Sequence, residues 1–134
     1  MIPRPPERHG AARFARDWVP VLLYLTVIFV VSAQANLKVP IPFPNSDKVC
    51  HLLEYGGLGL LLARALRRGG PVGAATGGAA LILGMITGAA DELFQRSVPG
   101  RVSSPYDWAA DIAGLALAIL IYGRSVRRPG GATS

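Results

Sequence analysis

The chain has 134 residues, of which 51% are hydrophobic, and it carries a formal net charge of +6. This length favours a single domain. Lysine and arginine lie in short segments beside apolar runs and form no basic stripe interleaved with aromatic residues, which argues against a nucleic-acid-binding protein. Cys50 is the one cysteine, so an internal disulfide is excluded.

Four apolar runs follow one another along the chain. Each is about the length that a helix needs to cross roughly 30 Å of hydrocarbon. Backbone groups inside a bilayer must find hydrogen-bond partners within their own segment, so we expect helices. The predicted fold is therefore an all-α bundle of four transmembrane helices. The runs occupy residues 18–34, 47–66, 72–95 and 105–122.

Short segments rich in turn residues separate the runs. The first is NLKVPIPFPNS, whose prolines block a helix, and the other two are RRGGP and RSVPGRVSS. We expect one membrane domain over residues 18–122, with poorly ordered basic tails at 1–17 and 123–134.

Basic residues are distributed unevenly between the two sides of the predicted bundle. Ten of the fourteen lie in the two tails and around the second connection, and the other four are Lys38, Lys48, Arg96 and Arg101. The positive-inside rule places the richer side in the cytoplasm. We therefore expect a multi-pass protein of the cytoplasmic (inner) membrane with both termini in the cytoplasm.

The first run has a second interpretation. Basic residues, an apolar stretch and the sequence Ala33-Gln34-Ala35 also fit a signal peptide with its cleavage site. Cleavage would leave three spans in the same orientation. The apolar stretch is long for a signal peptide, so we favour a retained helix.

Glycines of the third run have the spacing of close helix contacts. Gly73 and Gly77, and likewise Gly84 and Gly88, are four residues apart, which lets helix backbones approach closely. We expect tight packing within one bundle in preference to dimerisation, and the sequence leaves the oligomeric state open.

Ionisable residues gather near one predicted membrane face, the outer one by the charge rule. Helical spacing places Asp47, His51, Glu54 and Tyr55 along one face of the second run, and two later runs contribute at corresponding depths. The sequence therefore predicts an outward-facing polar pocket. Its expected residues are Asp47, Lys48, His51, Glu54, Tyr55, Asp91, Glu92, Gln95, Arg101, Asp107 and Asp111.

Some of these residues also have a purely structural interpretation. Asp47 and Asp107 lie at predicted helix N-termini, where a carboxylate stabilises the free N–H groups, and Tyr55 could be an interfacial aromatic. Asp91 and Glu92 instead lie near a helix C-terminus, where the dipole disfavours anions. Glu54 and Asp111 lie deeper still. An ionised group in hydrocarbon costs about 2.5–3.5 kcal/mol, so these four need a cation, a shared proton or a water-filled cavity.

Three blocks of the sequence resemble the signature blocks of the VanZ-like family of small polytopic membrane proteins. They are DKVCHLLEYGGLG at 47–59, DELFQ at 91–95 and GRVSSPYDWAADIAG at 100–114. In the last block the chain has Asp111 where the family pattern leads us to expect asparagine. The resemblance implies that the family's site positions here are Asp47, Lys48, His51, Tyr55, Asp91, Glu92, Gln95, Arg101 and Asp107.

The resemblance also implies a link to the cell envelope, because the family is named after a protein associated with resistance to glycopeptide antibiotics, notably teicoplanin. We therefore expect an accessory or binding protein for membrane lipids or lipid-linked envelope precursors. Arg101 and Lys48 would meet a phosphate group. We further expect Arg101 to pair with Asp91 or Glu92.

The alternative is a membrane-embedded, metal-assisted hydrolase or transferase acting on a lipid phosphoester. Its candidate metal ligands are His51, Glu54, Asp91 and Glu92. No His-Glu-x-x-His signature is present, and no serine or cysteine nucleophile has an evident base, so we favour a binding protein over an enzyme. No organic cofactor is evident in the sequence, and a divalent cation remains open.

Overall fold

The computed structural model describes residues 8–35 and 44–127. Within these ranges the chain forms four helices and no strand: α1 (Arg8–Ser32), α2 (Ser46–Leu66), α3 (Ala74–Gln95) and α4 (Pro105–Ser125). All four are long and apolar enough to cross a membrane. The predicted all-α bundle of four spans is therefore confirmed. The expectations for residues 1–7, 36–43 and 128–134 lie outside the described residues.

The first helix begins earlier than the apolar run. Its first residue is Arg8, whereas the run begins at Trp18, so residues 8–17 are helical although we expected a poorly ordered tail there. Alanine and arginine, which dominate residues 11–16, are strong helix formers. A run of apolar residues marks the part of a helix that lies in hydrocarbon, and the helix itself can continue into water.

Local chemistry explains where two other helices begin and end. Ser104 accepts a hydrogen bond at 3.2 Å from the backbone N–H of Tyr106, and Pro105 occupies the first turn of α4. After α2 the chain turns through Arg68 and Gly69, which have positive φ angles of 48° and 88°. This left-handed turn stops α2 and sends the chain back as α3.

Helices α2 and α4 make the closest contact in the bundle. At Gly114, an added Cβ would overlap the carbonyl group of Leu52 and lie 3.0 Å from the backbone nitrogen of Gly56. At Gly59, it would lie 2.9 Å from the carbonyl oxygen of Leu115. Glycine is thus required on both sides for the two backbones to approach this closely.

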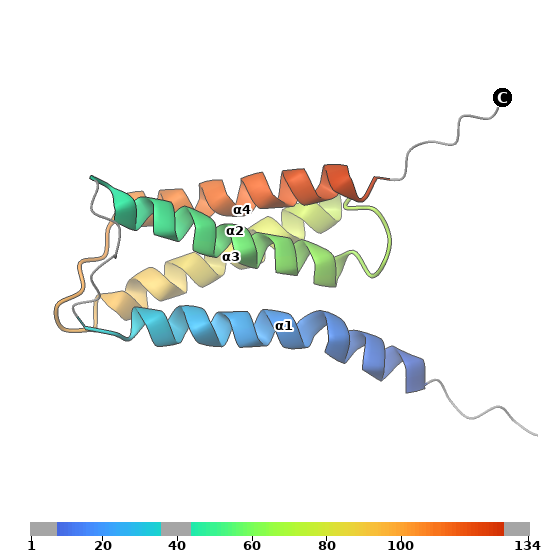
Figure 1. Ribbon diagram of the computed structural model, residues 1–134, viewed down its shortest axis with the longest axis horizontal. Coiled ribbons are helices and arrows are strands. Elements are labelled where there is room, and N and C mark those ends of the chain that lie inside the picture. Colours follow the sequence, from blue (N-terminus) through green and yellow to red (C-terminus); the bar gives the residue numbers. More distant parts are fainter. Residues whose placement is uncertain (1–7, 36–43, 128–134) are drawn as a thin grey trace, which may run out of the picture.

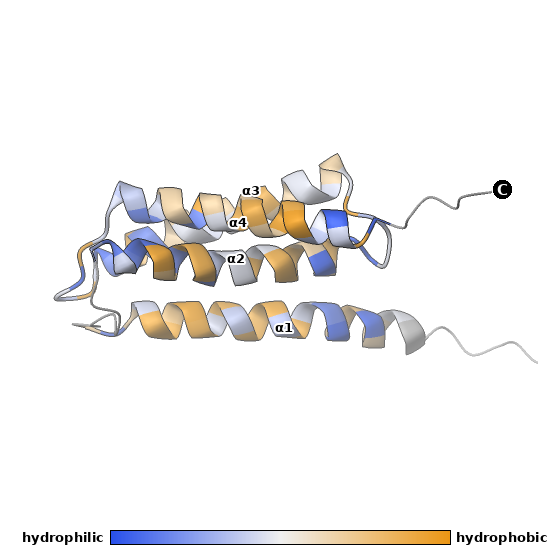
Figure 2. Cartoon of the chain, turned by 45° about the horizontal axis from the view of Figure 1, so that its top comes forward, coloured by the Kyte–Doolittle hydropathy of each residue, from blue (hydrophilic) through white to orange (hydrophobic). Residues whose placement is uncertain are grey.

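Helices α3 and α1 pack on this pair (Figure 1). The core between the helices includes Tyr55, Leu58 and Leu115, which are fully buried. Large apolar side chains such as Leu53 and Ile86 are exposed. Figure 2 shows hydrophobic segments along the middle of the helices, with hydrophilic residues at both ends of α2 and in the first part of α1. A membrane-spanning bundle has this pattern.

The N-terminal end of α1, the connection between α2 and α3, and the C-terminal end of α4 lie at the same end of the bundle (Figure 1). The predicted site residues lie toward the opposite end, where α3 connects to α4. The two ends therefore differ in charge: arginines gather at the first, and carboxylates gather at the second.

Candidate functional site

Three helices bring ionisable side chains together at the end of the bundle where α3 connects to α4. The carboxylates of Asp111, Asp91, Asp107 and Glu92 are buried, with exposed fractions of 1%, 2%, 5% and 7%. Such burial inside a membrane protein is costly unless each group has partners. We call this group the polar cluster; its members are Lys48, His51, Asp91, Glu92, Gln95, Asp107 and Asp111.

An imidazole–carboxylate pair joins α2 to α4. The Nδ1 atom of His51 lies 2.9 Å from Oδ1 of Asp111, and both side chains are largely buried. Gly88 of α3 faces the pair, because a Cβ there would lie 3.2 Å from Oδ2 of Asp111. The absence of a side chain at Gly88 thus allows α3 to close over His51 and Asp111.

A lysine bridges two carboxylates at the same end of the bundle. The Nζ atom of Lys48 donates to Asp47 at 2.9 Å and to Asp107 at 3.1 Å. Asp107 is buried, whereas about half of the Asp47 side chain is exposed. The Asp107 carboxylate therefore contacts a cation on α2, and the N-cap of α4 is provided by Ser104.

A third set of contacts links α3 to α1. Gln95 Nε2 donates to Oδ2 of Asp91 at 2.8 Å and to Oγ of Ser32 at 3.3 Å, and both Gln95 and Ser32 are buried. Sequence reasoning missed Ser32. The one available signal was a hydroxyl at the end of an apolar run, which is too common in membrane helices to single out a residue.

Several buried oxygens of the site have no hydrogen-bond partner among the described residues. They are Oδ1 of Asp91, Oε1 of Glu92, Oδ2 of Asp111 and Oη of Tyr55. Tyr55 is fully buried in the core, so the interfacial alternative for this residue is wrong. Buried polar atoms are nearly always paired. Within the described residues the three carboxylate oxygens lack a donor or cation, and the Tyr55 hydroxyl lacks an acceptor.

Three members of the cluster could hold a metal ion. One ring nitrogen of His51 and one carboxylate oxygen each of Glu92 and Asp107 lie within 4.8 Å of one another. His51 and Glu92 were candidates from the sequence, and Asp107 is an addition. The structure does not bring Glu54 or Asp91 into this group.

Comparison with known protein families identifies the family of the chain. A family model described as VanZ/LLP1 matches residues 8–126, which is nearly the whole chain. The chain belongs to the VanZ/LLP1 family. No curated protein and no solved structure matches it. Since the match spans all four helices, family membership covers the bundle as well as the polar cluster.

Asp111 has a specific consequence in this VanZ/LLP1 chain. The resemblance to the family led us to expect asparagine at this position, and an asparagine would offer the imidazole a neutral amide. The carboxylate of Asp111 instead gives His51 a charged acceptor, which forms the stronger kind of hydrogen bond.

The two arginines of the α3–α4 connection have different surroundings. Arg96 is exposed and donates from Nε to Oγ of Ser103 at 3.0 Å. Arg101 is half-buried and makes no side-chain hydrogen bond or ion pair within the described residues. The expected pairing of Arg101 with Asp91 or Glu92 is therefore wrong. Helical periodicity does not fix the conformation of a connection, so the sequence could not place this side chain.

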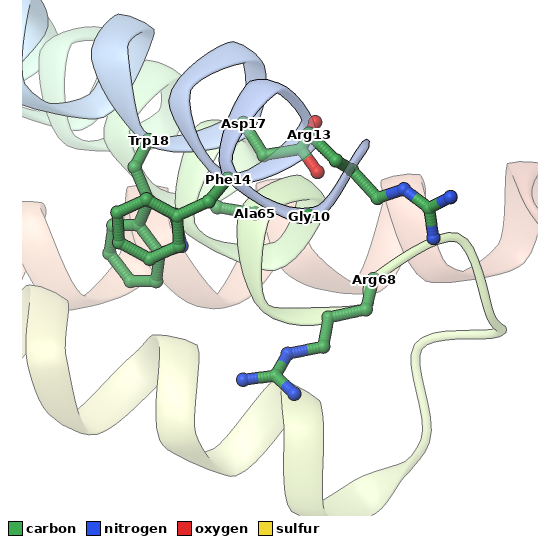
Figure 3. A pocket seen from close by; sticks show the side chains of 7 residues that line it. All are labelled: Gly10, Arg13, Phe14, Asp17, Trp18, Ala65 and Arg68. Carbon is green, nitrogen blue, oxygen red and sulfur yellow. The ribbon is translucent and has the colours of Figure 1, made fainter. Parts of the chain in front are cut away.

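A separate cavity of about 290 Å³ lies at the arginine-rich end, between the start of α1 and the end of α2 (Figure 3). Its one acidic side chain, Asp17, accepts from Arg16 at 3.2 Å and lies 3.8 Å from Arg64. None of the predicted site residues lines it, so it is distinct from the polar cluster. The lining residues are Gly10, Arg13, Phe14, Asp17, Trp18, Ala65 and Arg68.

Proposed function

We propose that this VanZ/LLP1 protein is an accessory or binding protein of the inner membrane that holds the phosphate-bearing head group of an envelope lipid or lipid-linked precursor. By the positive-inside rule the polar cluster faces outward, where such precursors are used. The protein would then affect susceptibility to glycopeptide antibiotics, which bind envelope precursors.

The observation that supports this proposal is the half-buried Arg101, which has no anionic partner within the described residues. In the described part of the chain, the guanidinium donors of Arg101 are free to bind a ligand, and their planar arrangement matches two oxygens of a phosphate group. Arg101 also lies in the connection at the end of the spans, which is the depth of lipid head groups.

The test measures phospholipid and lipid-linked precursor that co-purify with the protein in mild detergent, by mass spectrometry and phosphorus analysis. We expect Arg101→Ala to lose most of the bound lipid. Arg101→Lys should retain part of it, because an ammonium group cannot make the bidentate contact. Arg96→Ala is the matched control: it removes an exposed arginine from the same connection and should retain the parent's lipid content.

The proposal fails if Arg101→Ala, at normal abundance in the membrane, holds as much lipid as the parent protein. A glycopeptide-sensitivity assay on the same strains then reports the cellular consequence. The effect on glycopeptide susceptibility should follow lipid retention. It should be largest for the parent and Arg96→Ala, smaller for Arg101→Lys and smallest for Arg101→Ala.

One observation favours the second candidate, a metal-assisted hydrolase or transferase acting on a lipid phosphoester. His51 and Asp111 form an imidazole–carboxylate pair, and a carboxylate in this position orients an imidazole for proton transfer or metal binding. In hydrolysis, water would lose a proton to a base as it attacks phosphorus, and the lipid alcohol would leave with a proton. Release of inorganic phosphate from a lipid phosphate, abolished by His51→Gln, would replace the binding proposal with this one.

A further inference from the structure

We propose that His51, Glu92 and Asp107 form a binding site for one divalent metal ion, with Asp111 as the residue that positions His51. The three ligands come from α2, α3 and α4, so the ion would join the three helices at the outer end of the bundle. The site does not depend on the proposed function. Only its last part, the identity of the outer ligand, rests on that proposal.

The geometry is close to that of a bound ion. Ligand atoms at about 2.1 Å from a tetrahedral zinc ion are about 3.4 Å from one another. The three atoms here lie within 4.8 Å of one another. The side chains therefore need to close by at most about 1.4 Å, which changes of side-chain torsion angle can supply without a backbone movement.

An unpaired carboxylate oxygen independently points to a cation. Glu92 is 7% exposed, and its Oε1 atom has no hydrogen-bond partner in the described part of the chain. It lies near the C-terminal end of α3, where the helix dipole is unfavourable to an anion. A metal ion would supply the positive charge that the helix does not.

The balance of charge around the site also favours a bound cation. At this end of the bundle α2 carries Asp47 and Glu54, α3 carries Asp91 and Glu92, and α4 carries Asp107 and Asp111. Among the described residues, the cations of the same end are Lys48, Arg96 and Arg101. Six acids against three cations leave an excess of acids. Lys48 engages Oδ1 of Asp107, and Oδ2 of Asp107 is left for the metal.

The contact between His51 and Asp111 is of the kind that a carboxylate makes with a metal-binding histidine. Histidines that bind metals usually donate their other ring N–H to a carboxylate, which fixes the tautomer and raises the basicity of the ligand nitrogen. Here Nδ1 of His51 would donate to Asp111 at 2.9 Å, and Nε2 would carry the lone pair for the metal. Asp111 thus acts through His51 and does not touch the ion.

The ligand set also indicates the kind of metal. One imidazole and two carboxylates suit Zn²⁺ or Mn²⁺ and are too poor in oxygen for Ca²⁺. Three protein ligands leave a coordination position open. If the proposed function holds, that position takes a phosphate oxygen of the lipid head group, whose second oxygen would meet Arg101.

The experiment uses the full chain, purified in detergent, stripped with a chelator and dialysed against Zn²⁺ or Mn²⁺. Elemental analysis should give about one ion per chain. We expect His51→Gln and Glu92→Gln to lower the affinity more than 100-fold, and Asp111→Asn to lower it about 10- to 100-fold. Asp17→Asn is the matched control, because Asp17 is a carboxylate of α1 at the opposite, arginine-rich end of the bundle, and this variant should bind like the parent.

A measurement on the unaltered protein keeps the test independent of variant folding. Co²⁺ added to the stripped protein should give visible absorption bands of a nitrogen–oxygen site, and Zn²⁺ should displace it. A parent chain that binds no Co²⁺ or Zn²⁺ above the level of Glu92→Gln overturns the proposal. So does a loss of metal in Asp17→Asn equal to that in His51→Gln.

Lipid content measured on the same samples separates this inference from the proposed function. Loss of metal with full retention of lipid in Glu92→Gln supports the metal site and overturns phosphate as its outer ligand. Loss of lipid in Arg101→Ala with one ion still bound supports both the metal site and the proposed function. Binding of lipid by a parent chain that takes up no metal overturns the metal site alone.

Discussion

At the scale of single residues, Gly114 offers the sharpest test of the packing. A methyl group there would overlap the backbone of α2 at Leu52. We expect Gly114→Ala to lower the free energy of unfolding by about 1–3 kcal/mol, since overpacking forces backbones apart. Thermal unfolding in detergent, followed by loss of the monodisperse protein, measures this.

The control for this substitution is Gly78→Ala. Gly78 lies within α3, and an added Cβ there would meet nothing within 4 Å. Alanine is a better helix former than glycine, so this variant should be as stable as the parent or more so. Equal losses of stability in the two variants would show that the close contact between α2 and α4 does not exist in the membrane protein.

At the same scale, the limits of sequence reasoning are visible in the polar cluster. Helical spacing correctly placed Asp107 and Asp111 on one face of a helix, but it could not say which residues of α2 they would meet. The contacts of Asp111 with His51 and of Asp107 with Lys48 depend on how α2 and α4 are rotated and shifted against each other. That register is set by glycine contacts between helices, which a single sequence does not reveal.

At the scale of the elements, the contacts of α1 favour a retained helix over a cleaved signal peptide. It buries Val21 and Ile28 almost completely, and Ser32 contacts Gln95 of α3. Tyr24 donates to the backbone oxygen of Glu54 at 2.9 Å and packs against Gly57 of α2. These contacts would be lost by cleavage after Ala35.

We therefore expect α1 to be present in the mature protein. Intact-mass analysis of protein purified with a C-terminal tag should give the mass of a chain that includes residues 8–35. A mature chain that begins at Asn36 would contradict the expectation and would leave Gln95 without the hydroxyl of Ser32.

The helix boundaries themselves were well predicted for α2, α3 and α4, because prolines, glycines and charges mark where hydrocarbon ends. The start of α1 was not, since residues 8–17 are polar yet helical. Hydropathy indicates whether a segment lies in hydrocarbon or in water, and helix propensity indicates whether its backbone forms a helix. The boundaries predicted from hydropathy and from helix propensity agree only where a helix ends at the membrane surface.

At the scale of the whole molecule, the charge asymmetry predicts an orientation. We expect Val102 to face the cell exterior and Pro71 to face the cytoplasm. Both are exposed in the structure, and they lie in connections at opposite ends of the bundle. Val102→Cys and Pro71→Cys, each in a Cys50→Ser background, can be labelled in intact cells with a membrane-impermeant thiol reagent.

Labelling of Val102→Cys alone is the expected result, and permeabilised cells should label both variants. The reverse pattern would invert the molecule and place the polar cluster on the cytoplasmic side. A head-group ligand would then have to come from the inner leaflet, which would exclude the envelope role as proposed.

The close contact of α2 with α4 also determines how the molecule can open. The two helices are held together along their length by backbone-to-backbone packing at Gly59 and Gly114, and they carry His51, Asp107 and Asp111 as one rigid unit. Glu92 belongs to α3, which closes over that unit through Gly88. Separating α3 from this pair would therefore remove Glu92 from the cluster, while the contacts of His51 with Asp111 and of Lys48 with Asp107 would remain.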